Sequence, residues 1–140
     1  MGFKGNFEHT LDDRGRVALP AKYRDQFGTQ AVLTMSPDGC VQVFTKEGFD
    51  RMSEDVAKES PKTLAGRRAR RLFDGQAFDA ELDRQGRILI PAKFRERAHL
   101  NGAVVIVGCT EWLEIWEPSA WEAELRAAAA ASSPEQGPEG

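Results

Sequence analysis

Apolar and polar residues alternate over residues 5–11, and this pattern predicts a β-strand. Residues 12–15 have the composition of a turn, in which Gly15 is free to take a positive φ. A second short strand is predicted over residues 16–19, because the residue before a proline is driven to extended geometry and Pro20 comes next. The chain is therefore expected to open with two strands joined by a tight turn.

The following segment predicts a short helix and then a hairpin. Proline suits the first position of a helix, so residues 21–27 are expected to form about two helical turns. Gly28 is expected to end that helix. Residues 30–35 and residues 40–45 predict two strands, joined by a Ser-Pro-Asp-Gly turn.

This whole pattern occurs twice in the chain. Residues 11–25 align with residues 82–96 at an offset of 71, and Leu, Asp, Gly, Arg, Pro, Ala, Lys and Arg recur at equivalent positions. The second unit is therefore expected over residues 77–117. A unit of about 45 residues is too small to support a stable core alone. Two copies in one chain can cover each other's apolar faces about a pseudo-two-fold axis, as in a homodimer.

The segment between the units, residues 46–74, is expected to be helical. Pro61 is expected to end a first helix, and a second begins near Lys62. The second helix has an apolar stripe at helical spacing, formed by Ala65, Ala69, Leu72 and Phe73.

The C-terminal part predicts one further helix and a tail. Pro118 is expected to open a helix that runs to about residue 130, with Trp121 and Leu125 on one face. Residues 131–140 are polar and rich in Pro and Gly, so we expect them to be a disordered tail.

Composition places the chain among globular proteins, with 41% apolar and 29% charged residues. No apolar run approaches the ~20 residues of a membrane span, and residues 1–6 contain no secretory signal. The net charge of −3 is unevenly distributed, because residues 111–140 hold seven acidic residues and a single base, Arg126. The rest of the chain is mildly basic, which permits a local patch that binds nucleic acid without proving one.

The sequence offers no recognisable metal site or catalytic motif. The isolated residues Cys40, Cys109, His9 and His99 do not have the spacing of zinc ligands. We interpret the cysteines as free buried thiols, although the sequence alone leaves a Cys–His nucleophile pair open. Nucleotide-binding and hydrolase motifs are missing as well. We therefore expect a protein that is not an enzyme and needs no cofactor.

The sharpest chemical feature is an Asp-x-x-Gly-Arg turn that occurs in both units. Asp12 and Arg16 flank the first turn, and Asp83 and Arg87 flank the second. A carboxylate that holds a guanidinium in one orientation prepares it to read guanine O6 and N7 in the major groove. A hairpin turn with a purely structural Asp–Arg pair explains the same pattern equally well.

Other basic residues admit two interpretations each. Four of them, on the two short helices, suit either phosphate contacts or solvated helix faces: Lys22, Arg24, Lys93 and Arg95. A second group on the connecting helix suits either DNA or the acidic C-terminal helix of a neighbouring subunit: Arg67, Arg68, Arg70 and Arg71.

Together these features resemble the MraZ family of bacterial regulators, which carries two SpoVT–AbrB-like DNA-binding units in tandem. The resemblance extends from residue 3 to about residue 125. It rests on the opening Phe3-Lys4-Gly5, on the D-x-x-G-R-x-x-x-P motif in both units and on the arginine-rich helix between them. A single motif would indicate only an AbrB-like unit, whereas two at this spacing are specific to MraZ.

The resemblance implies a mostly β fold with short helices (α+β). Two AbrB-like swapped-hairpin units would pack as an intramolecular pseudo-dimer barrel with flanking helices. The expected boundaries are unit 1 at 5–47, a helical connector at 48–75, unit 2 at 76–119, a C-terminal helix at 120–130 and a disordered tail at 131–140.

The resemblance also implies the function. Members of the family are cytoplasmic, nucleoid-associated transcription factors, usually repressors, which bind short direct repeats in double-stranded DNA upstream of their own division and cell-wall gene cluster. They assemble into homo-oligomeric rings of about eight subunits. The DNA-contacting residues carry over to Asp12, Arg16, Asp83 and Arg87, with Arg14 as a further base where the second turn has Gln85.

An alternative is a protein-interaction module like the AbrB-like antitoxins, whose tail wraps around a toxin. A second DNA-binding unit occupies the place of such a tail here, which disfavours that alternative.

Overall fold

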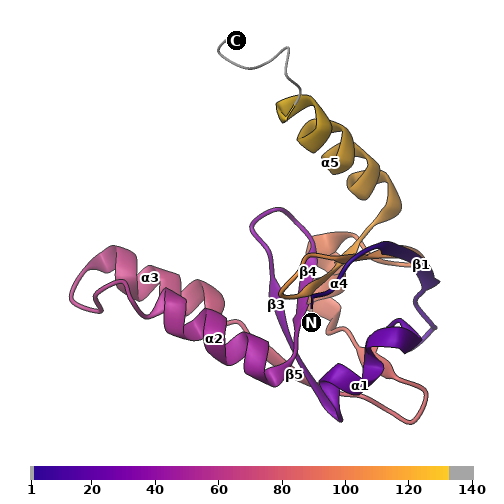
Figure 1. The fold of residues 1–140 in the computed structure, drawn as a ribbon, viewed down its shortest axis with the longest axis horizontal. Coiled ribbons are helices and arrows are strands. Elements are labelled where there is room, and N and C mark those ends of the chain that lie inside the picture. Colours follow the sequence, from indigo (N-terminus) through magenta and orange to yellow (C-terminus); the bar gives the residue numbers. More distant parts are fainter. Residues whose placement is uncertain (1, 133–140) are drawn as a thin grey trace.

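The computed structural model describes residues 2–132, and strands and short helices alternate along it (Figure 1). The first unit contains β1 (Asn6–Thr10), β2 (Arg16–Ala18), η1 (Ala21–Tyr23), α1 (Arg24–Phe27), β3 (Gln30–Met35) and β4 (Val41–Phe44). The connector contains α2 (Lys46–Val56) and α3 (Leu64–Phe73). The second unit contains β5 (Phe78–Glu81), β6 (Arg87–Leu89), α4 (Ala92–Ala98), β7 (Ala103–Gly108) and β8 (Leu113–Trp116), and α5 (Pro118–Ala131) follows it. The predicted α+β class is confirmed. Of the tail expected at 131–140, Ala131 is instead the last residue of α5, and residues 133–140 lie outside the described part of the chain.

The two units exchange strands within one antiparallel sheet. Its order is β1-β7-β8-β4-β3-β5, so the first strand of each unit lies beside the hairpin of the other unit. β1 pairs with β7 from Asn6 opposite Val107 to Thr10 opposite Ala103, and β5 pairs with β3 in the same way. The hairpins meet in the middle, where β4 pairs with β8. This exchange makes the two units depend on each other, as the pseudo-two-fold interpretation predicts.

The sheet is not a closed barrel, and in this respect the prediction was wrong. β1 and β5 form its two edges, and β2 pairs only with β6 in a separate two-stranded ribbon. Each edge ladder stops where the chain turns: the N–H of Leu11 donates to Gly102, and the next N–H, of Asp12, donates to Arg16 within the turn. The same change of partner occurs at the start of the second turn. The chain therefore leaves the sheet to build the ribbon, and the two edges stay unjoined in the described part.

The core fills the space between the six-stranded sheet and the ribbon. The middle residues of the ribbon strands, Val17 and Ile88, are 1% and 0% exposed and belong to the main hydrophobic cluster. Successive side chains of a strand point to opposite faces. The flanking residues of each ribbon strand therefore point outward, and these include Arg16 and Arg87.

The connector forms a helical hairpin that extends away from the sheet (Figure 1). Thr45 caps α2 and Thr63 caps α3, each by accepting a hydrogen bond from the N–H three residues on. α2 ends at Val56, well before the predicted stop at Pro61. The rings of Phe49 and Phe73 stack between the helices with centroids 4.8 Å apart. The predicted stripe on α3 is only partly buried, because Leu72 is 67% exposed.

α5 packs against the body only at its start. The side chain of Glu117 caps its first turn by accepting from the N–H of Ala120, and Trp121 packs on Trp116 with centroids 5.9 Å apart. Later residues of the helix are exposed, and Leu125 does not share the packing of Trp121 because it is 50% exposed. None of the helices in the described part has the length and apolar character of a membrane span.

Candidate nucleic-acid interface

Both Asp-x-x-Gly-Arg segments fold as the same tight turn. Asp12 Oδ1 accepts hydrogen bonds from the N–H groups of Arg14 and Arg16, at 2.9 and 2.8 Å. Gly15 takes φ 81°, a left-handed conformation that glycine adopts without steric cost. In the second turn Asp83 Oδ1 makes the equivalent bonds, and Gly86 has φ 73°. The aspartate therefore organises the turn, and the glycine makes its geometry possible.

The remaining carboxylate oxygen of each aspartate holds the arginine at the end of its own turn. Arg16 Nε donates to Asp12 Oδ2 at 2.8 Å, and Arg87 Nε donates to Asp83 Oδ2 at 2.8 Å. The sequence predicted these two pairs. Because the carboxylate holds the Nε edge, the guanidinium plane is fixed relative to the ribbon.

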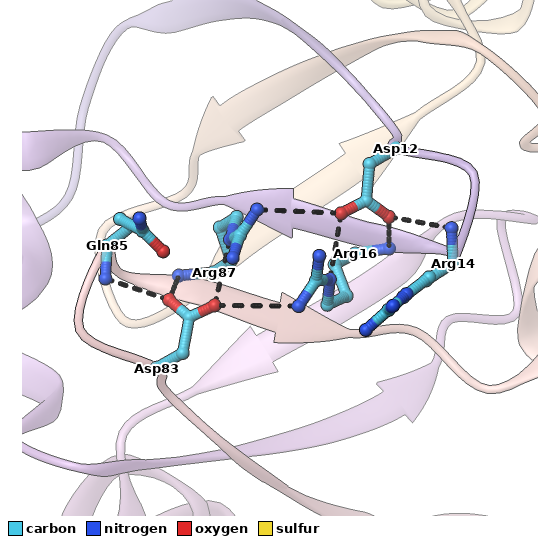
Figure 2. A network of polar contacts seen from close by, with 6 residues as sticks. All are labelled: Asp12, Arg14, Arg16, Asp83, Gln85 and Arg87. Carbon is cyan, nitrogen blue, oxygen red and sulfur yellow. Dashed lines mark hydrogen bonds and ion pairs between the residues drawn. The ribbon is translucent and has the colours of Figure 1, made fainter.

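The two pairs also interact with each other across the ribbon (Figure 2). Arg16 Nη1 lies 4.0 Å from Asp83 Oδ2, and Arg87 Nη1 lies 3.8 Å from Asp12 Oδ2. The ribbon register causes this approach, since Arg16 lies opposite Leu89 and Ala18 opposite Arg87. The four residues form one crossed ion-pair network with pseudo-two-fold symmetry, which the sequence analysis did not foresee.

The network keeps both carboxylates ionised. Hydrogen bonding from the N–H of Arg16, aided by the guanidinium and the N–H of Arg14, lowers the pKa of Asp12 to about 2. The pKa of Asp83 is also lowered, first by the N–H of Arg87 and then by its guanidinium. Both arginines therefore keep their charged partner across the physiological pH range.

The arginines remain open to a partner. The side chains of Arg16 and Arg87 are 28% and 31% exposed. Within residues 2–132 their Nη atoms make no hydrogen bond, since the cross-ribbon distances of 3.8 and 4.0 Å exceed hydrogen-bond range. Each guanidinium therefore has donors left for a ligand on the outer face of the ribbon.

The tips of the two turns differ in charge. Arg14 is exposed on the first turn, and Gln85 holds the equivalent place on the second, at the opposite end of the ribbon (Figure 2). The residue before each also differs: the first turn has exposed Asp13, the second exposed Arg84. Arg84 was not among the residues predicted from the sequence to contact DNA. Comparing the charge of the two turns position by position would have found it, because the second turn has a base at residue 84 where the first turn has Asp13.

Two of the helix arginines are structural. Arg24 Nε donates to the carbonyl of Leu19 and Arg95 Nε to that of Ile90, both at 2.9 Å. Each guanidinium also lies against the glycine of the opposite turn, so that a Cβ at Gly86 or Gly15 would collide with it. These arginines brace the ribbon, whereas Lys22 and Lys93 are exposed and available to a polyanion.

The connector arginines also divide into two pairs. Arg67 donates to the carbonyls of Pro61 and Lys62, and Arg70 donates to those of Gly66 and Ala57, so this pair fastens the loop between α2 and α3. Arg68 and Arg71 are exposed and make no such bond within residues 2–132. Arg68 and Arg71 are therefore the pair whose guanidinium groups are not engaged within the connector, whereas Arg67 and Arg70 use part of theirs there.

The cysteines do not have the environment of nucleophiles. Cys40 is fully buried and Cys109 half-buried, and both are free. Burial raises the pKa of Cys109 to about 12, with Glu114 adding to the effect, and burial raises the pKa of Cys40 as well. Both stay protonated at neutral pH, which disfavours the Cys–His alternative. In the part of the chain that the structure describes, no cluster of three or more metal-ligating side chains occurs.

Comparison with known proteins gives consistent matches over nearly the whole chain. The family model described as "MraZ protein, putative antitoxin-like" matches twice, over residues 3–72 and 73–138. A protein from Moorella thermoacetica is 42% identical over 89% of this chain and 87% of its own length. One from Thermomicrobium roseum is 38% identical over 91% and 90%, and one from Heliobacterium modesticaldum is 42% identical over 85% and 83%. Each of these relatives is named "Transcriptional regulator MraZ".

Proposed function

The chain belongs to the MraZ family of transcriptional regulators, and we propose that it is a repressor that binds short direct repeats in double-stranded DNA. In this proposal the repeats lie upstream of its own gene, in a cluster for cell division and cell-wall synthesis. The protein would work in the cytoplasm, associated with the nucleoid. The relatives are named as regulators, which agrees with the expectation that the chain is not an enzyme.

The crossed ion-pair network is the observation that carries the proposal. A two-stranded β-ribbon fits the major groove of B-DNA, and an arginine can bond guanine O6 and N7 with two donors. Here the ribbon presents Arg16 and Arg87 on one face, each with its Nε edge held at 2.8 Å by a carboxylate. In this mechanism the two arginines read base edges, while Asp12 and Asp83 keep the arginines in place.

Phosphate contacts would set the register of the ribbon on the duplex. Arg14 at one end of the ribbon and Arg84 at the other are exposed and suited to this role, as are Lys22 and Lys93. Such contacts add affinity without reading sequence. The number of basic residues suited to phosphate contacts is small, as expected for a chain whose formal net charge is −3.

Affinity would then depend on several subunits binding at once, and we propose a homo-oligomeric ring of about eight subunits. The support from the structure is charge complementarity between different surfaces. Arg68 and Arg71 are exposed on α3, and Glu122 and Glu124 are exposed on α5. A contact between two different surfaces of identical chains is head-to-tail, and such contacts form a ring when the rotation between neighbouring subunits closes.

The proposed division of the chain follows the repeat. It comprises units at 5–47 and 76–119, a connector at 48–75 and a C-terminal helix at 120–130. The family description also contains the term antitoxin-like, which corresponds to the protein-interaction alternative. The open, pre-oriented arginines favour DNA. A protein that covered them would also bury the two aspartates, and removing these four charged side chains from water costs free energy.

A mobility-shift assay with the DNA upstream of the gene tests the proposal. We expect wild-type protein to bind this duplex in preference to a scrambled duplex of equal length, and Arg16→Ala to lose most of this preference. Lys58→Ala is the matched control, because it removes one positive charge from an exposed side chain paired with Asp55, outside the ribbon. Equal binding of both duplexes by wild-type protein would reject the proposed function.

A further inference from the structure

One large apolar side chain lies on the outer face of the ribbon, among its charged residues. Leu89 is 44% exposed, whereas its neighbours Ile88 and Ile90 are fully buried. The ribbon register places Leu89 directly opposite Arg16. Directly opposed residues in an antiparallel pair have Cβ atoms about 5 Å apart. Leu89 is therefore the residue beside Arg16 on the face that Arg16 presents.

The fold does not require a leucine at this position. The pseudo-two-fold axis relates Leu89 to Ala18, which lies opposite Arg87 in the same register. Ala18 occupies the equivalent site with a single methyl group, and the turn, the ion pairs and the buried residues around it have the same arrangement. The larger side chain of Leu89 thus adds exposed apolar surface on one side of the network and is not needed for the turn or for the packing of the ribbon.

From this geometry we propose that Leu89 contacts the 5-methyl group of a thymine in the base pair next to the guanine read by Arg16. The inference rests on the proposed DNA binding of the ribbon. Only thymine offers a methyl group in the major groove, and apolar side chains recognise it there. Successive base pairs are about 3.4 Å apart, so a side chain about 5 Å from Arg16 reaches the neighbouring pair.

The surroundings of Leu89 favour DNA over a protein as the occupant. The same face carries the network residues Asp12, Arg16, Asp83 and Arg87. A protein surface apolar enough to cover Leu89 would strip water from these charges without replacing it. The major groove offers acceptors for the arginines and, at a thymine, an apolar group one base pair away. Since Ala18 cannot reach as far, the contact would also make the two halves of the ribbon read different base steps.

The test compares thymine with deoxyuridine, which lacks only the methyl group. Each thymine of the bound repeats is replaced in turn, and the Kd is measured for wild-type protein and for Leu89→Ala. At one thymine beside a guanine we expect wild-type protein to lose about 4-fold in affinity per repeat, the effect of one buried methyl group. Leu89→Ala should lose a similar factor on the thymine duplex and nothing more on the deoxyuridine duplex.

Leu125→Ala is the matched control, because it shortens a leucine that is 50% exposed on α5. This variant should keep the full deoxyuridine effect, even if its overall affinity changes through assembly. The inference is overturned if no thymine methyl affects wild-type binding, or if Leu89→Ala keeps the same deoxyuridine effect as wild-type protein. Failure of wild-type protein to prefer the repeats over scrambled DNA would instead reject the DNA-binding proposal itself.

Discussion

Arg16 Nη1 lies 4.0 Å from Asp83 Oδ2, although 67 positions of the chain separate the two residues. The pairing of β2 with β6 brings them together, and the reciprocal approach of Arg87 to Asp12 at 3.8 Å follows from the same register. Each arginine is therefore positioned by both halves of the chain. A change in one half is expected to disturb recognition by the other.

Arg16→Ala is expected to weaken binding to the upstream DNA while leaving the fold intact. One bidentate base contact is worth roughly 1–3 kcal/mol, and in the proposed ring every subunit would repeat the loss. The side chain is partly exposed and is not a member of the core cluster, so the circular dichroism spectrum and melting temperature should stay close to wild type. A folded Arg16→Ala protein with wild-type affinity would show that this arginine does not read DNA.

Arg87→Ala is expected to lose less affinity than Arg16→Ala. The side chain opposite Arg87 is Ala18, whereas Arg16 has Leu89 beside it and exposed Arg14 in its own turn. Arg84 is the base that remains at the tip of the second turn, so the double variant Arg84→Ala/Arg87→Ala separates its contribution. A larger loss for Arg87→Ala than for Arg16→Ala, measured on the same duplex, would reverse this ranking of the halves.

The lowered pKa of Asp12 predicts a dependence of stability on acid. Its folded pKa of about 2 lies below the ordinary value of 3.8, so the folded state favours the ionised form. The stabilisation is fully present above pH 3.8 and is lost as the pH falls towards 2. Asp12→Asn should therefore show a shallower fall in the free energy of unfolding between about pH 4 and pH 2. Chemical denaturation at closely spaced pH values would measure it, and parallel curves for the two proteins would contradict the assignment.

The two kinds of arginine on α3 should respond differently to removal. Arg70→Ala deletes hydrogen bonds to the carbonyls of Gly66 and Ala57 and should lower the unfolding free energy by about 1 kcal/mol. Arg68→Ala removes an exposed side chain from the same helix and should leave stability within about 0.5 kcal/mol of wild type. Denaturant titration of both variants measures the difference. Equal stability of the two would show that Arg70 does not fasten the connector.

Spacing of the repeats should control affinity if several subunits bind at once. Neighbouring subunits share one face of the duplex only when half-sites recur about every 10 bp, one helical turn. An insertion of about 5 bp between repeats should abolish tight binding, and about 10 bp should restore it. Affinity should also fall steeply with salt, because each phosphate contact releases counterions. Equal affinity for one isolated repeat and for a phased array would rule out this mechanism.

Local features of the fold could be predicted from the sequence because local chemistry determines them. The hairpin strand at residues 30–35, the glycine turns and the proline that opens α5 were all predicted within a residue or two. The exchange of strands between units was implied only by the family resemblance. The departure of the ribbon from the sheet could not be predicted, since it depends on the pairing of β2 with β6, which lie far apart in the chain.

In the candidate site, too, the local contacts could be predicted from the sequence and the long-range contacts could not. The pairs within each turn follow from the spacing of Asp and Arg, whereas the contacts across the ribbon depend on the register of β2 and β6. The bracing role of Arg24 and Arg95 was also hidden, because each meets the turn of the opposite unit. These residues resemble solvated helix positions in the sequence, and only the tertiary fold shows what their side chains contact.

In the proposed mechanism, Arg16 and Arg87 read guanines in the major groove. Replacing each guanine of the repeats with 7-deazaguanine removes the N7 acceptor, and the Kd of wild-type and variant proteins for each substituted duplex then shows which guanines the arginines contact. We expect wild-type protein to lose affinity at two guanines per repeat, Arg16→Ala to be insensitive at one of them, and Arg87→Ala to be insensitive at the other. Full sensitivity of both variants at every position, or no sensitivity in the wild-type protein, would contradict this mechanism.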